Sequence, residues 1–284
     1  MPLQLNCGKQ RSISTDLPAF IMGIVNATED SFFNASRSTH LQKNIDRALA
    51  LEAQGADILD IGGESTRPGS VYVSVEEELE RVIPLVTAIR KRSAIPLSVD
   101  TRKSAVMELA FAAGAEICND VSALEDDVRL GPLIAKAGGS VVLMHKQGIP
   151  LTMQQNRTDA ADIKAEVQAY LAGRMQYAIA CGIPKARIML DYGIGFGKTA
   201  ADNYKLISGT ASFTQLGCPL LVGISRKSCI SALLQKTADT CLTGTLAAEM
   251  YAVQQGAAVV RVHDVGETRD MLLMLRELQK YGNT

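Results

Sequence analysis

Eight short apolar segments with the composition of β-strands recur along this chain of 284 residues, and most end in a polar or glycine-rich cluster. They span residues 21–26, 57–63, 97–100, 116–119, 141–145, 187–191, 220–225 and 259–263. In a barrel of parallel strands, the carboxyl ends of all strands form one rim, and that rim carries the active site. The pattern therefore predicts an α/β fold, a (β/α)8 TIM barrel with its active site at the C-terminal rim of the strands.

Helical patterns separate these segments, over residues 41–54, 75–92, 103–113, 159–180, 243–255 and 267–281. The second begins with three glutamates and ends in Arg-Lys-Arg, a charge order that complements the helix dipole. Four glycines stand just before a strand segment, at Gly55, Gly114, Gly182 and Gly256. Glycine is favoured where a helix connects to a strand, so the alternation predicts right-handed βαβ units and one parallel sheet.

The length of 284 residues suits a single domain, since a (β/α)8 barrel takes roughly 250 residues. We expect a single domain spanning residues 1–284, with the barrel over about residues 20–282 and an N-terminal extension over residues 1–18. The six cysteines form no Cys-x-x-Cys pair, so reduced thiols are expected rather than a zinc site.

The net charge of -1 gives no broad basic field, so neither nucleic acid nor an anionic membrane is an expected partner. No apolar run approaches the ~20 residues that span a bilayer. The N-terminus also lacks the apolar core of a signal peptide. A cytoplasmic location is therefore expected.

Polar side chains collect at the predicted strand ends. They are Asn26, Asp60, Glu64, Asp100, Asn119, His145, Asp191, Ser225, Arg261 and His263. Among them, Asp100, Asn119 and Asp191 offer carboxylates and an amide to a flat heterocycle, and a carboxylate pairs well with an N–C–N edge. Carboxylates buried in a barrel mouth are costly unless a ligand matches them, which indicates a guanidine-like ring as in pterins or purines.

A second set of rim residues is cationic: Arg67, Arg226, Lys227, Arg261 and His263. Arginine and histidine at the end of the last strand, beside a helix N-terminus, are typical of a phosphate or pyrophosphate site. The glycine-rich segment over residues 62–70 has turn residues and the length of a functional loop on a barrel rim.

Two nucleotide-binding motifs fail on their spacing. A Walker loop that ends at Lys198 would need glycine at position 192, where Tyr192 stands. The dinucleotide pattern that begins at Gly195 would need an aspartate or glutamate between positions 203 and 226 to bind the ribose, and the sequence has none there.

The three histidines are far apart in the sequence, so a histidine-rich metal site is not expected. A magnesium ion that bridges a substrate pyrophosphate needs only one or two protein oxygens. Asn26 is the candidate ligand for Mg2+.

Eight short motifs of this sequence resemble those of dihydropteroate synthases, the folate-pathway family that sulfonamides target. NATEDSF at 26–32 resembles the first family signature, and DIGGESTRPG at 60–69 resembles the second and very specific one. SVDT (98–101), ND (119–120), MH (144–145), GFGK (195–198), GISRKS (223–228) and RVHD (261–264) follow in the family's order. The resemblance covers about residues 21–265.

The resemblance implies a barrel, usually dimeric, that joins 6-hydroxymethyl-7,8-dihydropterin diphosphate to 4-aminobenzoate and releases pyrophosphate. By position, the pterin site is formed by Asp100, Asn119, Asp191 and Lys227. The pyrophosphate site is formed by Asn26, Arg261 and His263, with Mg2+ facing Asn26. The mobile loop holds Thr66, Arg67 and Pro68. Ser225 and Lys227 flank the aminobenzoate, and Phe196 and Gly223 complete the substrate-binding set.

The resemblance also implies a mechanism. Cleavage of a C–O bond leaves a carbocation on the electron-rich pterin, while cations stabilise the departing diphosphate. The aniline nitrogen then attacks this cation, so the loop must exclude water. Asp100, Lys227 and Arg67 are the residues expected to act in catalysis.

The sequence departs from the family pattern at several positions. Glu29 occupies a position where proline is usual, and residues 33–37 lack the usual glycine pair. Tyr192 also replaces a proline, Lys146 replaces an apolar residue, and Arg102 stands where a small residue is common. These departures leave sulfonamide sensitivity open.

Two other functions fit a pterin-binding barrel. One is a folate-dependent methyltransferase, which the segments Thr66–Arg67–Pro68 and Ser225–Arg226–Lys227 disfavour. The other is a non-catalytic paralogue, which would be expected to have lost residues such as Asp100 or His263; both are present.

Overall fold

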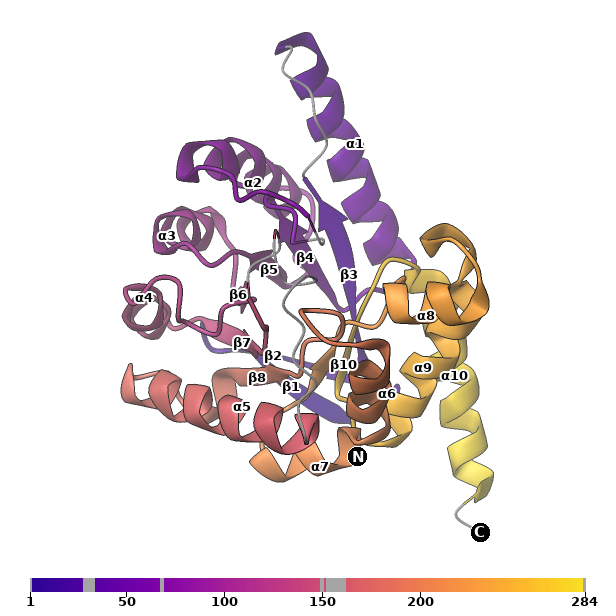
Figure 1. Ribbon diagram of the computed structural model, residues 1–284. Coiled ribbons are helices and arrows are strands. Elements are labelled where there is room, and N and C mark those ends of the chain that lie inside the picture. The colour runs from indigo at the N-terminus through magenta and orange to yellow at the C-terminus, as the bar shows by residue number, and fades with distance from the viewer. Residues whose placement is uncertain (1, 28–33, 67–68, 149–150, 152–161, 283–284) are drawn as a thin grey trace.

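The computed structural model describes residues 2–27, 34–66, 69–148, 151 and 162–282, with the backbone alone over residues 34–38. Eight parallel strands form the centre of the molecule (Figure 1). They are β3 (Phe20–Asn26), β4 (Ile58–Gly62), β5 (Leu97–Asp100), β6 (Ile117–Asp120), β7 (Ser140–Met144), β8 (Ile188–Asp191), β9 (Leu221–Val222) and β10 (Val259–Val262). All eight predicted strand segments are thereby confirmed.

The strands follow the order β8-β7-β6-β5-β4-β3-β10-β9, in which each strand lies beside its sequence neighbour. The remaining gap, between β8 and β9, is bridged by a parallel pairing of Leu190 with Leu220. The Leu190 N–H also donates to the Pro219 carbonyl at 3.0 Å. The sheet therefore closes on itself, and the predicted single-domain (β/α)8 barrel is confirmed.

Ten helices in the described residues surround the barrel (Figure 1). They are α1 (Asn34–Ala53), α2 (Val75–Arg90), α3 (Ser104–Ala113), α4 (Leu130–Ala137), α5 (Ile163–Ala180), α6 (Ala200–Ser208), α7 (Thr210–Phe213), α8 (Ser228–Leu234), α9 (Leu242–Gln254) and α10 (Val265–Gly282). Short 3-10 turns occur at Lys185–Arg187, Thr214–Leu216 and Ala238–Thr240.

The six predicted helices are present with small shifts of their ends, except that α1 begins well before residue 41. Helices α4, α6, α7 and α8 were not predicted, because each is too short for its apolar spacing to stand out. Ser74 begins α2 with a capping box to Glu77.

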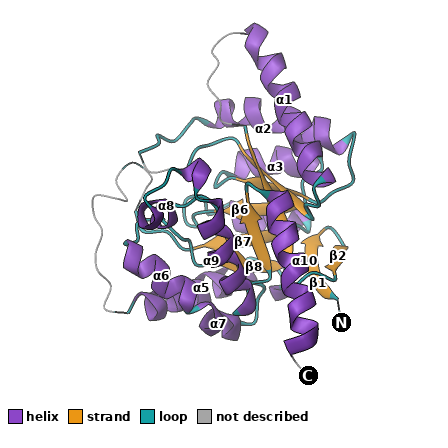
Figure 2. Cartoon of the chain, turned by 90° about the vertical axis from the view of Figure 1, so that its right-hand side faces the viewer, coloured by secondary structure: helices purple, strands orange, loops and turns teal. Residues whose placement is uncertain are grey.

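An antiparallel hairpin, β1 (Leu3–Gly8) and β2 (Arg11–Thr15), precedes the barrel (Figure 2). Its buried side chains Leu5 and Cys7 pack in one cluster with Met22 of β3 and other residues from the N-terminal halves of the strands. The Ser140 hydroxyl of β7 donates to the Asn6 carbonyl at 2.9 Å. The predicted N-terminal extension is therefore a plug that closes the mouth of the barrel opposite to the rim.

Alternation along the strands sorts the barrel interior into two layers. Ile117, Met189 and Val259, on β6, β8 and β10, belong to the apolar cluster at the plugged end. Two positions further along these strands stand Asn119, Asp191 and Arg261, whose side chains point to the same face because the period of a strand is two. The barrel interior is therefore apolar at the end that the hairpin closes and polar at the C-terminal rim.

In the described part of the chain, no helix is both long enough and apolar enough to cross a membrane. The cytoplasmic location expected from the sequence stays a prediction.

Candidate active site

A buried layer of charged and amide side chains lies at the C-terminal ends of the barrel strands. Its members are Asp60 (β4), Asp100 (β5), Asn119 (β6), Asp191 (β8) and Arg261 (β10), all of which the sequence analysis had placed at strand ends. The four acidic and amide side chains are at most 8% exposed. Groups this polar are buried at a cost, so their partners decide whether the layer is structural or functional.

Arg261 is the centre of this layer. Its Nε donates to Asp60 Oδ2 at 2.6 Å, and its Nη2 donates to Asp100 Oδ2 at 2.9 Å. The amide of Asn119 donates to the same Asp60 oxygen at 3.0 Å. Asp60 itself was not among the predicted site residues, although it is completely buried and links Arg261 to Asn119.

Asp100 faces two opposing influences on its protonation. Burial raises the pKa of this carboxyl to about 7, while the nearby Arg261 guanidinium acts in the opposite direction. The ion pair with Arg261 thus favours the ionised carboxylate against the effect of burial.

Asp191 presents one carboxylate oxygen to the interior. Its Oδ1 accepts the Gly193 N–H at 2.7 Å, while its Oδ2 lies near Gly223. A Cβ added to Gly223 would have that oxygen, at 4.0 Å, as its nearest neighbour. Burial raises the pKa of Asp191, while the charge of Lys227 lowers it. Open space thus adjoins a carboxylate that can accept donors from a ligand.

Lys227 lies between the acidic residues and an aromatic ring. Its ammonium group stands 4.4 Å from the centroid of the Phe196 ring, an arrangement that favours a cation. Burial and the charge of Arg261 lower the pKa of Lys227 to about 8. The structure therefore brings together Lys227 and Phe196, which the sequence had assigned to the same site.

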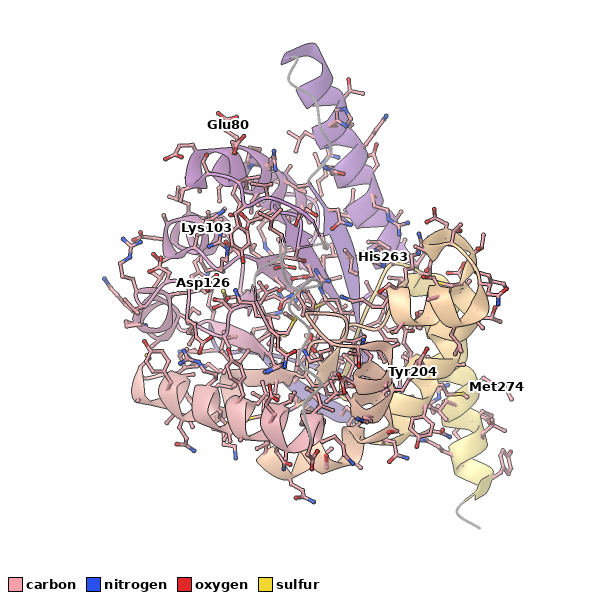
Figure 3. The ribbon with its side chains drawn as sticks, in the orientation of Figure 1. Glu80, Lys103, Asp126, Tyr204, His263 and Met274 are labelled. Atoms are coloured by element: carbon pink, nitrogen blue, oxygen red, sulfur yellow. The ribbon has the colours of Figure 1, made fainter. Side chains whose placement is uncertain are left out.

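Ser225 and His263 form a second group at the rim, beside the first turns of α8 and α10. The Ser225 hydroxyl lies 3.1 Å from the ring nitrogen Nδ1 of His263, and the backbone N–H of His263 donates to the same hydroxyl at 3.3 Å. Arg47 of α1 donates to the His263 carbonyl at 2.6 Å. Figure 3 shows His263 on the side of the barrel where α1 and α8 lie.

The structure does not bring Arg226 into the predicted cationic set. Its guanidinium pairs with both carboxylate oxygens of Asp264, at 3.0 and 2.6 Å, and with Asp239 at 2.8 Å. The backbone of Arg226 has a φ of 59°, in the left-handed region. Arg226 fixes the loop before α8 instead of supplying positive charge to the pocket.

The remaining predicted residues lie on two loops of the rim. Asn26 is exposed at the end of β3, opposite Gly62 of β4. Thr66 is half-buried in the connection from β4 to α2. Arg67 and Pro68 lie outside the described residues, so their assignments stay predictions.

Lys198 is a buried residue of the site that sequence reasoning missed. Its ammonium group donates to three carbonyls, those of Gly193 at 2.7 Å, His145 at 3.2 Å and Phe196 at 3.4 Å. Burial lowers its pKa to about 7. Lys198 thus holds the β8–α6 loop against the end of β7 and places the Phe196 ring beneath Lys227.

The chain matches known proteins over nearly its whole length. The family model of pterin-binding enzymes matches residues 22–263. The dihydropteroate synthase of Haemophilus influenzae is 42% identical over 252 residues, which cover 89% of this chain and 91% of that protein. The chain belongs to the dihydropteroate synthase family.

Solved structures of dihydropteroate synthases have the same fold. The Xanthomonas albilineans enzyme with 4-aminobenzoic acid has a TM-score of 0.89 and 41% identity, over 98% of this chain and 99% of that one. The same enzyme with 7,8-dihydropteroate has a TM-score of 0.85 and 38% identity, over 97% and 98% of the two chains. These synthase matches do not support the alternative of a folate-dependent methyltransferase.

One departure from the dihydropteroate synthase pattern lies outside the pocket. The Tyr192 side chain is fully buried, packs against the Phe213 ring at 5.3 Å between centroids, and bonds through its hydroxyl to Thr210 at 3.1 Å. It fills the space between the barrel and α7. Tyr192, which stands where the family pattern has proline, therefore packs its side chain toward α7.

Proposed function

We propose that this protein is a dihydropteroate synthase that condenses 6-hydroxymethyl-7,8-dihydropterin diphosphate with 4-aminobenzoate, giving 7,8-dihydropteroate and pyrophosphate. The observation that carries the proposal is the layer around Arg261, which holds the buried Asp100, Asn119 and Asp191 beside Lys227. The Xanthomonas relatives, which bind 4-aminobenzoic acid and 7,8-dihydropteroate, support it.

Asp191 and Asn119 recognise the pterin ring in this proposal. The free oxygen of Asp191 accepts from the amidine-like edge of the ring, and Asn119 contributes its amide oxygen, while its side-chain NH2 group already donates to Asp60. A carboxylate that already has one backbone donor is fixed in orientation, so it can discriminate the donor pattern of a pterin from that of other flat rings.

Asp100 and Lys227 act on the reacting part of the pterin. The C–O bond to the diphosphate breaks with its electron pair leaving on oxygen, and positive charge spreads over the dihydropterin. The carboxylate of Asp100 stabilises this charge. The aniline nitrogen of 4-aminobenzoate then forms the new C–N bond and loses a proton to solvent or to the released diphosphate.

The diphosphate binds where Arg261, His263 and the N-terminus of α10 meet. Among the described residues, no three histidine, cysteine or acidic side chains gather in a way that could hold a metal ion by themselves. Asn26 is exposed at the rim, and its amide oxygen would be the protein ligand of a Mg2+. When bound, Mg2+ would neutralise charge on the departing diphosphate.

The aminobenzoate site lies between Ser225, Lys227 and the connection that carries Thr66, together with Arg67 and Pro68. Ser225 and Lys227 come from the loop that follows β9, and Thr66 comes from the β4–α2 connection. Exclusion of water from this space protects the cation from hydrolysis.

A homodimer is part of the proposal. Exposed apolar side chains lie on three consecutive helices, with Leu233 on α8, Met250 and Tyr251 on α9, and Met274 and Leu278 on α10. Figure 3 shows Met274 on the outer side of α10. Apolar side chains on adjoining outer helices are typical of a surface that a second copy covers.

Lys227→Met tests the proposed pterin site. The methionine keeps the apolar stem beside Phe196 but removes the charge, so we expect the dissociation constant for the dihydropterin diphosphate to rise about 10- to 100-fold. Isothermal titration calorimetry measures it directly. Lys136→Met, on the exposed face of α4, is the control and should bind as the parent does. If the Lys227 variant and the control bound the dihydropterin diphosphate equally well, Lys227 would not be part of the pterin site.

A further inference from the structure

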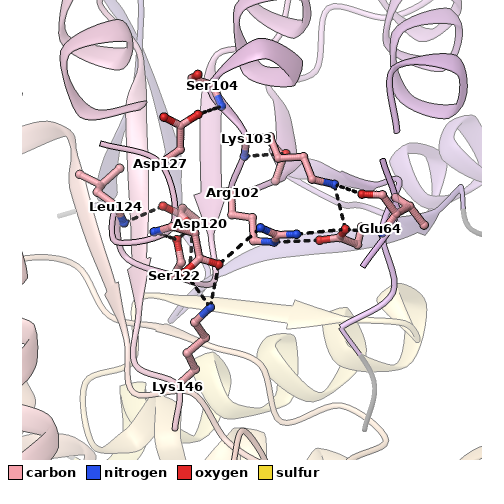
Figure 4. A network of polar contacts seen from close by, with 12 residues as sticks. Glu64, Arg102, Lys103, Ser104, Asp120, Ser122, Leu124, Asp127 and Lys146 are labelled. Carbon is pink, nitrogen blue, oxygen red and sulfur yellow. Dashed lines mark hydrogen bonds and ion pairs between the residues drawn. The ribbon is translucent and has the colours of Figure 1, made fainter. Parts of the chain in front are cut away.

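Six charged side chains form a continuous chain along the rim beside β4, β5, β6 and β7. In order of contact they are Glu78, Lys103, Glu64, Arg102, Asp126 and Lys146. Anions and cations alternate, with three of each. Figure 4 shows four of them, Glu64, Arg102, Lys103 and Lys146. Arg102 and Lys146 are two of the positions at which this sequence departs from the family pattern, and they meet at Asp126.

The distances show that this chain of six charged side chains is well formed. Lys103 Nζ lies 2.5 Å from Glu78 Oε2 and 2.8 Å from Glu64 Oε2, while Arg102 Nε lies 3.1 Å from Glu64 Oε1. Asp126 Oδ2 lies 3.6 Å from Arg102 Nη1 and 3.0 Å from Lys146 Nζ. Glu64 is nearly buried, with 6% of its side chain exposed, so its ion pairs are poorly screened by solvent. Figure 3 shows Lys103 and Asp126 on this same side of the barrel.

Arg102 contacts both ends of the connection between β4 and α2. At the first end, it donates to Glu64; at the second end, its guanidinium stacks 3.5 Å from the centroid of the Tyr72 ring. Glu64 itself accepts the Val73 N–H at 2.8 Å, and the Ser70 hydroxyl donates to the Ser65 carbonyl at 2.6 Å. These contacts tie the two ends of the connection together.

Arg102 is also the middle of the charged chain. Without it, Glu64 and Glu78 would keep Lys103, and Asp126 would keep Lys146. No buried anion would lose its last cation, so the loss of Arg102 should loosen the connection and leave the barrel folded. Lys103 differs, because its loss would leave the buried Glu78 without a cation among the described residues.

We propose that Arg102 is a positioning residue that orders the β4–α2 connection before substrates bind and thereby strengthens the binding of 4-aminobenzoate. This rests on the proposed function, since Thr66 lies within the connection, two positions after Glu64. A loop that is already ordered costs less conformational entropy on binding, so the apparent affinity rises with the populated fraction of the competent state.

Hydrogen exchange of the free protein tests the structural part of the proposal. In Arg102→Ser, the amide of Val73, which donates to Glu64, is expected to exchange about tenfold faster than in the parent. The amides of β7 should exchange at the parent rate, which separates loop opening from global unfolding. Unchanged exchange at Val73 would overturn the proposal without bearing on the reaction that the protein catalyses.

Steady-state kinetics test the functional part. For Arg102→Ser, we expect the KM for 4-aminobenzoate to rise about tenfold while kcat stays within about twofold of the parent. Arg102→Lys keeps the charge but loses the planar stack and the second donor, so it should restore only part of the affinity. Arg129→Ser is the matched control, because Arg129 is exposed and, among the described residues, forms an ion pair with Asp127 alone.

The outcomes separate this proposal from the proposed function. Faster exchange at Val73 with an unchanged KM for 4-aminobenzoate would overturn the link from Arg102 to substrate binding. Equal effects of Arg102→Ser and Arg129→Ser would also overturn it. A parent protein that makes no dihydropteroate would refute the proposed function instead, and the exchange rates would still decide whether Arg102 orders the connection.

Discussion

Replacement of Asp100 by asparagine is expected to lower kcat/KM for the dihydropterin diphosphate about 100- to 1,000-fold. Asparagine has nearly the same shape as aspartate but cannot place a negative charge beside the developing cation. Arg261 would keep its other carboxylate partner, Asp60, at 2.6 Å, so the polar layer should stay assembled. The loss should therefore appear in turnover and not in folding.

The stability of this variant should depend on pH in a defined direction. Burial raises the pKa of Asp100 to about 7, above the ~3.9 expected in an unfolded chain. The folded parent therefore binds more protons, and its stability falls as pH rises between these two values. Asp100→Asn removes this dependence, so its stability relative to the parent should improve from about pH 4 to about pH 8.

Kinetic assays measure the loss of kcat/KM, and urea unfolding at about pH 4 and about pH 8 measures the change in stability. Ser98→Ala is a suitable control, because Ser98 lies two positions earlier on β5 and its buried hydroxyl has no partner in the described structure. It should turn over within about twofold of the parent. Near-parent turnover by Asp100→Asn would reject charge stabilisation by Asp100.

Replacement of Arg261 by methionine is expected to have the largest effect on stability. Two buried carboxylates, Asp60 and Asp100, would lose the cation that contacts both, and such a loss costs about 3 kcal/mol or more. The loss should be smaller at about pH 5 than at about pH 8, because the pKa of Asp100, already raised, would rise further without Arg261 and the carboxyl would be protonated.

Chemical unfolding at the two pH values measures this pH dependence, and calorimetry with pyrophosphate measures the loss of the anion site. We expect pyrophosphate to bind at least about tenfold more weakly. Arg129→Met is the control, since Arg129 is exposed and lies on a different loop. Equal destabilisation of Arg261→Met at both pH values would show that Asp100 does not respond to the arginine.

The barrel and most of its rim were predictable because both follow from short-range periodicity. Asp100, Asn119, Asp191 and Arg261 were all expected at strand ends, and they lie there. The sequence put Arg261 in a separate cationic set, whereas the structure pairs it with Asp60 and Asp100. The N-terminal hairpin was missed, since its turn residues Lys9 and Gln10 both have positive φ without the glycine or asparagine that usually marks such a turn.

Contacts between loops were beyond sequence reasoning. Lys198 is fixed by three backbone carbonyls from two loops, and no pattern of side chains marks that environment. Arg226 follows a strand end as Lys227 does, yet its guanidinium pairs with Asp264. Arg102 and Lys146 were visible only as separate departures until the fold brought both to Asp126.

The central claim is best tested by an assay of the purified protein with Mg2+, dihydropterin diphosphate and 4-aminobenzoate, in which each component is omitted in turn. Pyrophosphate release that depends on 4-aminobenzoate, together with one equivalent of 7,8-dihydropteroate detected by mass spectrometry, is the predicted result. Tight pterin binding with no release would contradict the claim and indicate a non-catalytic pterin-binding protein.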